Sequence, residues 1–136
     1  MLILLAACFD EENERLEALE LAEGRWADAG FEDYTYTLTW SCFCPEGGVP
    51  VQVEVVDGAV ASFTAEEDIG ETFVPSTIPD LFDAVRDAIE DDPHAFEAVY
   101  DTDLGYPTSV TVDPIENAID EEWGFTVTDL QAGSER

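Results

Sequence analysis

The stretch from Tyr34 to Cys44, YTYTLTWSCFC, alternates strictly between two kinds of side chain. Tyr, Leu, Trp and Cys side chains take every second position, while the positions between them carry Thr, Ser and Phe43. Successive side chains of a β-strand point to opposite faces, so this alternation predicts a strand with one apolar face. The side chains of Cys42 and Cys44 would both point to that apolar face.

Further elements are predicted on both sides of this strand. Valines alternate within 49–56, and Asp57-Gly58 is a strong hairpin signal that leads into a strand at 59–65. Three more strands are predicted at 95–100, 108–113 and 123–130. Residues 10–24 read as an acidic helix, and Gly24 or Gly30 is expected to end it.

The second predicted helix has the clearest boundaries. Thr77 and Asp80 have the spacing of a capping box at its start. Apolar residues then recur on one face of the helix, at Ile78, Leu81, Phe82, Val85 and Ile89. The order of elements predicts an α+β fold, with an antiparallel β-sheet built from hairpins and two helices packed on one face.

The charge of the chain is extreme. Among 136 residues there are 33 acidic side chains and 4 basic ones, all Arg, so the net charge is −29. Nucleic acids and anionic lipid surfaces are bound through basic clusters, so both are excluded as electrostatic partners. Hydrophobic residues nevertheless make up 46% of the chain, which favours a folded domain over a disordered one.

Self-repulsion of this size should destabilise the fold at low ionic strength. Because the Debye length falls to about 3 Å at 1 M salt, we expect the protein to work in a high-salt medium. The expected result is a higher unfolding midpoint in high NaCl than in low NaCl, and equal midpoints would contradict it. The alternative is that the acidic surface binds a cation or a partner, which Ca²⁺ titration at fixed ionic strength would reveal.

The first eight residues, MLILLAAC, are apolar and end in two small residues and Cys8. Leu5-Ala6-Ala7-Cys8 resembles the lipobox of bacterial lipoproteins. The resemblance implies that the chain is cut before Cys8 and that Cys8 carries acyl chains. These would anchor the protein on the outer, non-cytoplasmic side of the bacterial cell envelope. Phe9, in place of an Asp, implies delivery to the outer membrane.

The resemblance also divides the chain into segments. Residues 1–7 would be the remnant of a lipoprotein signal peptide. Because this apolar run is short and has no basic residue, we expect the natural start to lie upstream. Residues 8–32 would form the lipidated cysteine, an acidic tether and the N-terminal helix, 33–131 the α+β domain, and 132–136 a polar tail. The alternative is an apolar N-terminus that buries Cys8 in a core.

If Cys8 carries lipid, two cysteines remain. In an oxidising compartment this predicts a disulfide between Cys42 and Cys44. Their Cα atoms would be about 6.5 Å apart in an ideal strand, near the upper limit for a bridge, so we expect a bulge before Pro45. Two alternatives stay open: a redox-active C-x-C pair, and a metal site that adds His94 and a carboxylate.

A wider resemblance is carried by elements that follow one another in order. They are Trp26, Tyr34-x-Tyr36, Cys42-Phe43-Cys44, the valines before Asp57-Gly58, Thr77-Ile78, Leu81-Phe82, Tyr100-Asp101, Gly105-Tyr106-Pro107, Val112-Asp113 and Asp120-Glu121-Glu122. This pattern, over residues 26–130, is similar to a family of small bacterial secreted and lipid-anchored proteins of unknown function. The resemblance implies class and location but no activity.

One further group of residues suggests a ligand. Asp101, Asp103 and Asp113, around Gly105, could bind Ca²⁺, which prefers oxygen ligands. The alternative is a hairpin loop whose aspartates cap turns. No catalytic motif is found: the serines lack a G-x-S-x-G setting, and His94 has no nucleophile motif beside it. We therefore expect a non-enzymatic envelope interaction module without a cofactor. The alternatives are a Ca²⁺-dependent binding protein and a C-x-C thiol/disulfide protein.

Overall fold

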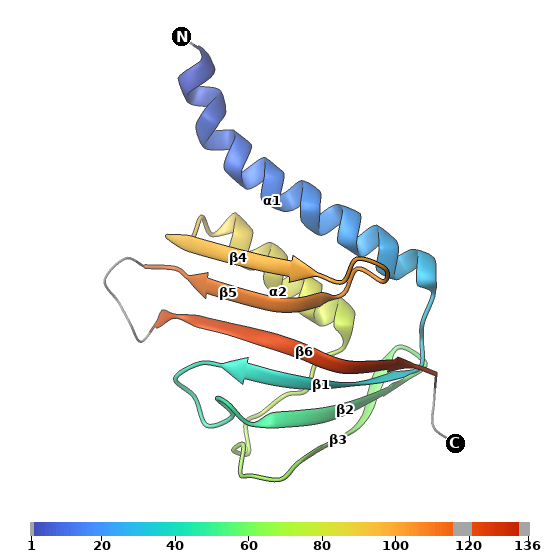
Figure 1. Ribbon diagram of the computed structural model, residues 1–136. Helices are drawn as coiled ribbons and strands as arrows, with labels where there is room; N and C mark the ends of the chain where they lie inside the picture. The colour runs from blue at the N-terminus through green and yellow to red at the C-terminus, as the bar shows by residue number, and fades with distance from the viewer. Residues whose placement is uncertain (1, 116–120, 134–136) are drawn as a thin grey trace.

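The computed structural model describes residues 2–115 and 121–133, with side chains described from residue 11 onward. Along these described residues, two helices and six strands follow one another (Figure 1). They are α1 (Leu2–Ala29), β1 (Tyr34–Ser41), β2 (Pro50–Val56), β3 (Ala59–Ala65), α2 (Ile78–Glu90), β4 (Ala95–Tyr100), β5 (Pro107–Asp113) and β6 (Trp123–Ala132). Within the described residues, no helix combines the length and apolar composition needed to cross a bilayer.

All six strands form one antiparallel sheet in the order β3-β2-β1-β6-β5-β4. Each half of the sheet is a run of consecutive strands. The halves meet where the first strand pairs with the last, with Leu38 opposite Val127 and Trp40 opposite Phe125. The centre of the sheet is therefore held by residues that lie far apart in the sequence.

This pairing corrects the predicted fold class. A sheet built from hairpins was wrong, because the β1–β6 pair is not a hairpin. The connection after β3 leads into α2, and α2 leads to β4 at the far edge, so the second run of strands returns toward β1. Strands contribute more residues than helices, a balance that is compatible with an α+β protein.

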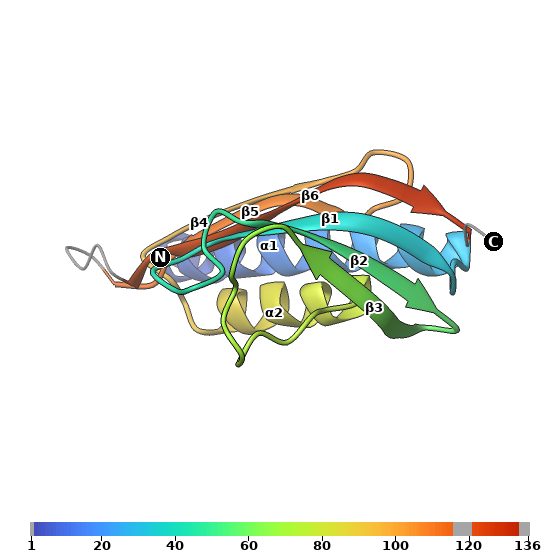
Figure 2. The ribbon, with the colours of Figure 1, turned by 90° about the horizontal axis from the view of Figure 1, so that it is seen from below.

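Both helices lie against the same face of the sheet (Figure 2). The face of α2 toward the sheet buries Ile78, Leu81, Phe82, Val85, Ala88 and Ile89, which include the five predicted stripe residues. The predicted capping box is confirmed: Thr77 Oγ1 accepts from the Asp80 N–H, and an Asp80 carboxylate oxygen accepts from the Thr77 N–H. The opposite face of the sheet carries polar side chains such as Thr35, Thr37 and Thr39, which are half-buried.

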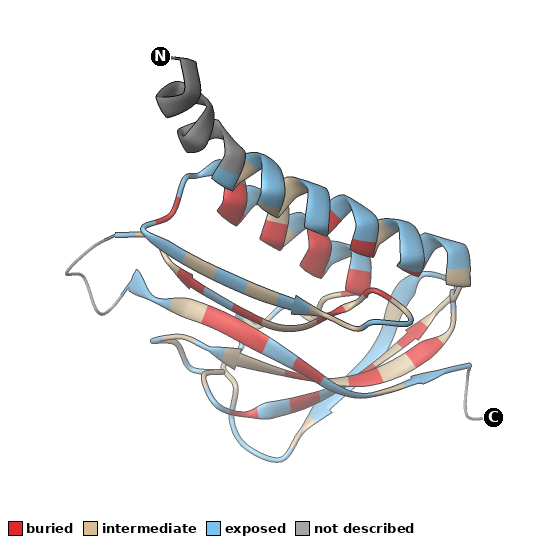
Figure 3. Ribbon diagram, turned by 45° about the horizontal axis from the view of Figure 1, so that its top comes forward, coloured by how far each residue is buried: buried red, intermediate tan, exposed pale blue. Residues whose placement is uncertain are grey.

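Helix α1 is longer than predicted and belongs partly to the core. It passes through Gly24 and ends where the Gly30 N–H bonds to the carbonyl groups of Trp26 and Ala27. Leu19, Ala22 and Trp26 are buried, and buried residues gather where the helices face the sheet (Figure 3). The second half of α1 is therefore part of the folded unit, in addition to any role as a tether.

The start of β1 is joined to the start of α2 by two tyrosine hydroxyls. The Tyr34 hydroxyl accepts a hydrogen bond from the Ile78 N–H at 2.9 Å, and the Tyr36 hydroxyl donates to the Ser76 carbonyl. Burial raises the pKa of Tyr34 to about 12 and raises that of Tyr36 further. Both phenols therefore stay neutral at physiological pH and hold the entry into α2 against the sheet.

Candidate functional site

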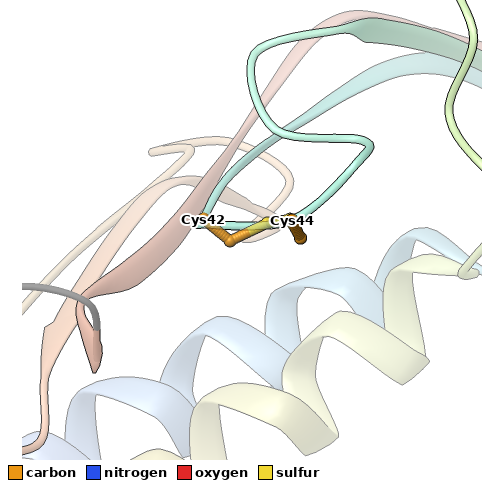
Figure 4. The surroundings of a disulfide bond; sticks show 2 residues. All are labelled: Cys42 and Cys44. Atoms are coloured by element: carbon orange, nitrogen blue, oxygen red, sulfur yellow. A yellow bond between two sulfur atoms is a disulfide. The ribbon is translucent and has the colours of Figure 1, made fainter.

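The candidate site is the loop that follows β1, residues 42–48, which we call the Cys42 loop. Strand β1 ends at Ser41, so the two cysteines lie in the loop rather than in the strand as predicted. The Cα atoms of Cys42 and Cys44 are 5.3 Å apart, and their sulfur atoms lie at disulfide-bonding distance (Figure 4). The departure from strand geometry brings the Cα atoms closer than the spacing of an ideal strand.

The backbone of the Cys42 loop is closed by three hydrogen bonds. The Gly48 N–H donates to the Trp40 carbonyl at 2.7 Å, the Gly47 N–H to the Cys44 carbonyl at 3.0 Å, and the Val49 N–H to the Glu46 carbonyl at 3.1 Å. A Cβ at Gly47 would lie 2.5 Å from the Cys42 carbonyl oxygen, so the loop can fold back only with glycine there. None of these bonds involves a sulfur atom.

The tip of the Cys42 loop is apolar and open to solvent. The Phe43 side chain is 85% exposed, the largest fraction among the exposed large hydrophobic side chains in the described part of the chain. In β1, just before the loop, the Trp40 ring lies 5.2 Å from the Phe125 ring and 6.2 Å from the Trp123 ring, measured between centroids. The loop thus carries one exposed aromatic ring, Phe43, and follows a strand whose last aromatic ring, Trp40, packs against Phe125.

A carboxylate lies beside the two sulfurs. An oxygen of Glu46 and the sulfur atoms of Cys42 and Cys44 all lie within 4.8 Å of one another. Across residues 11–115 and 121–133, this is the one group of three potential metal ligands with that spacing. The predicted metal alternative thus gains a carboxylate, whereas His94 is not in the group and makes a backbone bond to Pro114.

The aspartates proposed as Ca²⁺ ligands do not converge. The Asp101 carboxylate accepts hydrogen bonds from the N–H groups of Asp103 and Leu104, at 3.1 and 2.8 Å, as a turn-capping side chain does. Asp113 pairs with Ala95 at the other end of the β4–β5 hairpin. The structure therefore places Asp101 in a structural turn and separates Asp113 from it.

The turn at Asp101 brings the β4–β5 loop against α1. A Cβ at Gly105 would lie 2.2 Å from the Ala22 carbonyl oxygen, and Gly105 has a φ of +86°. The neighbouring Tyr106 ring meets the Trp26 ring at 6.2 Å between centroids. Burial first, and then the charge of Asp101, raise the pKa of Tyr106. The packing of the β4–β5 loop against α1 therefore accounts for Gly105 and Tyr106.

An ion pair between the helices was not predicted from the sequence. Arg86 of α2 donates two hydrogen bonds to the Glu23 carboxylate, at 3.0 and 2.7 Å, and these bonds raise the pKa of Arg86. The Arg86–Glu23 pair links the helices of a chain that has only four basic residues.

The Tyr100 hydroxyl is buried and has no hydrogen-bond partner among the described residues, and burial raises its pKa to about 12.

The proposed lipidation residue lies in the first half of α1. The backbone of Cys8 is helical, but its side chain is outside the described part of the structure, and so is the polar tail from residue 134. Asp120 of the Asp120-Glu121-Glu122 element also lies outside the described residues.

The domain itself matches a family model over residues 18–132, described as a family of unknown function, DUF6174. The chain belongs to this family. The predicted membership of a family of unknown function is confirmed, and the DUF6174 match includes the core-forming half of α1. Neither the curated proteins nor the solved structures gave a match.

The sequence indicated the two cysteines as a candidate site but missed both the exposed Phe43 and Glu46 beside the sulfurs. Glu46 follows Pro45 in a Gly-containing turn, where a carboxylate is ordinarily solvated. The signal that could have found it is the spacing Cys42-x-Cys44-x-Glu46, which places three potential ligands at alternate positions. Only the folding back of the loop at Gly47 brings the carboxylate to the sulfurs.

Proposed function

We propose that this DUF6174 chain is a non-enzymatic interaction module of the bacterial cell envelope, and that it contacts its partner through the Cys42 loop. The observation that carries the proposal is the exposed Phe43 ring on a closed loop. Aromatic side chains dominate the binding energy of many protein interfaces, and a ring held in one place loses little conformational entropy on binding.

The rigidity of the loop comes from two sources. The Cys42–Cys44 pair joins the residues on either side of Phe43, and the backbone hydrogen bonds of Gly47 and Gly48 fix the return of the chain. Preorganisation of this kind favours binding over local collapse of the ring onto the domain. The partner then needs an apolar pocket and a surface that tolerates a strongly acidic neighbour.

The lipid anchor is the second part of the proposal. Its support is the lipobox-like segment at Leu5-Ala6-Ala7-Cys8 and the continuity of α1 from this segment into the core. At about 1.5 Å per residue, the eight residue-to-residue steps from Cys8 to Leu16 span only about 12 Å. An acylated Cys8 would hold the domain close to the membrane on a short helix. The intact mass of protein extracted from its own membrane measures the acyl chains directly, and an unmodified Cys8 would remove this part.

The interaction proposal is tested by placing a photo-crosslinking residue at position 43 in the native host. The matched control carries the same residue at Val99, which is also exposed but lies on β4 at the far edge of the sheet. We expect one discrete adduct from position 43 and none from position 99. Equal labelling from both positions, or none from either, would contradict the proposal.

A second candidate function is thiol/disulfide exchange by the Cys42–Cys44 pair. The observation that favours it is that both residues are only partly buried and lie at bonding distance in a loop that a thiol could approach. Equilibration with a glutathione series gives the potential of the pair. A value in the range of disulfide oxidoreductases would support this function, and a much more negative value would identify a structural bridge.

A further inference from the structure

We propose that the Cys42 loop, once its cysteines are reduced, binds one Zn²⁺ through the sulfur atoms of Cys42 and Cys44 and a carboxylate oxygen of Glu46. The site shares the Cys42 loop with the interaction role proposed above, but metal binding and its test require neither the partner nor the lipid anchor. It rests on the grouping of these three ligand atoms within 4.8 Å.

The ligand types and the spacing suit this cation. Thiolates bind Zn²⁺ at about 2.3 Å and carboxylate oxygens at about 2.0–2.2 Å, usually in tetrahedral geometry. Neighbouring ligand atoms are then roughly 3.5 Å apart. The three atoms are already within 4.8 Å of one another, so rotations of the side chains can complete the site without movement of the loop. The fourth position would hold water or a partner's side chain.

The framework of the site does not depend on the sulfur–sulfur bond. The hydrogen bonds of Gly47, Gly48 and Val49 hold the loop, and they join backbone atoms only. The glycine at 47 keeps the chain folded back, so that Glu46 remains beside both cysteines. Reduction would therefore release two thiols into a site whose backbone is already arranged.

The chemistry begins with a dithiol reductant. It gives two electrons and two protons to the Cys42–Cys44 bond, which breaks into two thiols while the reductant closes its own disulfide. Binding of Zn²⁺ then displaces both protons from the thiols, because the thiolates are the ligands. The bridge closes a ring of only three residues, so it removes little chain entropy from the unfolded chain. The disulfide and the metal compete for the same two sulfur atoms.

The test uses the full chain, reduced with a dithiol and desalted without oxygen. Zn²⁺ is titrated in competition with a chromophoric chelator, and Co²⁺ serves as a spectroscopic probe because thiolate ligation gives an intense charge-transfer band. We expect one tight Zn²⁺ per reduced chain and a thiolate band with Co²⁺. The oxidised chain, which has the same sequence and fold, should lose both signals.

Three variants distinguish Zn²⁺ binding at this site from Zn²⁺ binding by the acidic surface. Cys42→Ser/Cys44→Ser measures the background binding of the other carboxylates. Glu46→Gln should weaken Zn²⁺ binding about tenfold or more, because even the loss of an outer-shell partner of a metal ligand typically costs that much. Glu66→Gln, a matched change at an exposed glutamate of the neighbouring β3–α2 connection, should leave it unchanged. Binding by the reduced chain no stronger than that background, or equal affinity of Glu46→Gln and the wild type, would overturn the proposal.

Discussion

The two ends of strand β1 differ although both belong to one alternating pattern. At its start, Tyr34 and Tyr36 are each 2% exposed and bond to the chain just before and at the beginning of α2. After its end, the Cys42 loop leaves Phe43 85% exposed, and the nearby Trp40 is only partly buried. The same sequence pattern therefore produces a core at one end and a surface at the other.

The difference follows from what covers each end. Trp26, at the last turns of α1, packs edge-on against Tyr34 at 5.1 Å and against Phe31 at 5.7 Å between centroids. At the other end, an open groove of about 250 Å³ lies between Trp123 and the last turns of α2. Close packing fixes the first end, whereas the Cys42 loop is held mainly by its own hydrogen bonds. We therefore expect stability to depend on the first end and binding on the second.

At the packed end, the largest effect is expected from Gly105→Ala. The new Cβ would meet the Ala22 carbonyl oxygen at 2.2 Å, and the φ of +86° disfavours any L side chain. We expect a loss of about 3 kcal/mol in the free energy of unfolding, measured by urea denaturation. Gly24→Ala is the control: a Cβ added at this exposed position of α1 meets nothing within 4 Å, and the change should stabilise α1 by about 0.5–1 kcal/mol. Equal effects of the two changes would show that the contact is not tight.

The next effect is that of Tyr34→Phe, which leaves the buried Ile78 N–H without its acceptor. We expect a loss of about 2 kcal/mol in the free energy of unfolding at neutral pH. Tyr100→Phe is the control, because its hydroxyl has no partner among the described residues, and it should be neutral or slightly stabilising. A larger loss in Tyr100→Phe than in Tyr34→Phe would contradict the assigned hydrogen bond.

The raised pKa of Tyr34 predicts that the stability of the fold depends on pH. The pKa of Tyr34 is about 12 in the folded chain and near 10.0 in the unfolded one. Between these values the unfolded chain releases the proton while the folded chain retains it, so stability falls as pH rises from about 10 to about 12. Below pH 10 this group adds no dependence. Denaturation at a series of alkaline pH values should give a shallower fall for Tyr34→Phe than for the wild type.

Loss of the disulfide should have a smaller effect on stability. We expect the oxidised wild type to be more stable than Cys42→Ser/Cys44→Ser by about 1.5 kcal/mol at most, because the bridge closes only three residues. Urea denaturation of both proteins under oxidising conditions measures this. A difference above about 3 kcal/mol would mean that the Cys42 loop supports the fold as strongly as the packed end does.

The smallest effect is expected from Phe43→Ala, whose ring makes little contact with the domain. The free energy of unfolding should change by no more than about 0.5 kcal/mol, while contact with the proposed partner is lost. Phe125→Ala removes the same kind of ring from the buried core and should lower the free energy of unfolding by about 3–5 kcal/mol. If Phe43→Ala destabilised the fold comparably, Phe43 would be a packing residue and the interaction proposal would fail.

Local signals predicted most of the elements correctly. The capping box at Thr77 and Asp80 and the apolar stripe of α2 depend on neighbours within one or two helical turns, which the sequence displays directly. The hairpin at Asp57-Gly58 is confirmed by the pairing of β2 with β3. The end of β1 at Ser41 was not predictable, because the pattern of alternation continues to Cys44 while the pairing with β6 stops at Gly124.

The sequence by itself determined the composition of the faces, the caps, and the family to which this acidic chain belongs, because periodicity and turn chemistry act over a few residues. Only the tertiary structure decided that β1 pairs with β6, that Asp113 lies far from Asp101, and that Glu46 meets two sulfurs. Such juxtapositions depend on how distant segments pack and on how one loop folds back at Gly47. The β1–β6 pairing follows from the packing of the whole chain, which no local pattern encodes, whereas the local spacing of Cys42, Cys44 and Glu46 brings the three side chains together only when the loop folds back.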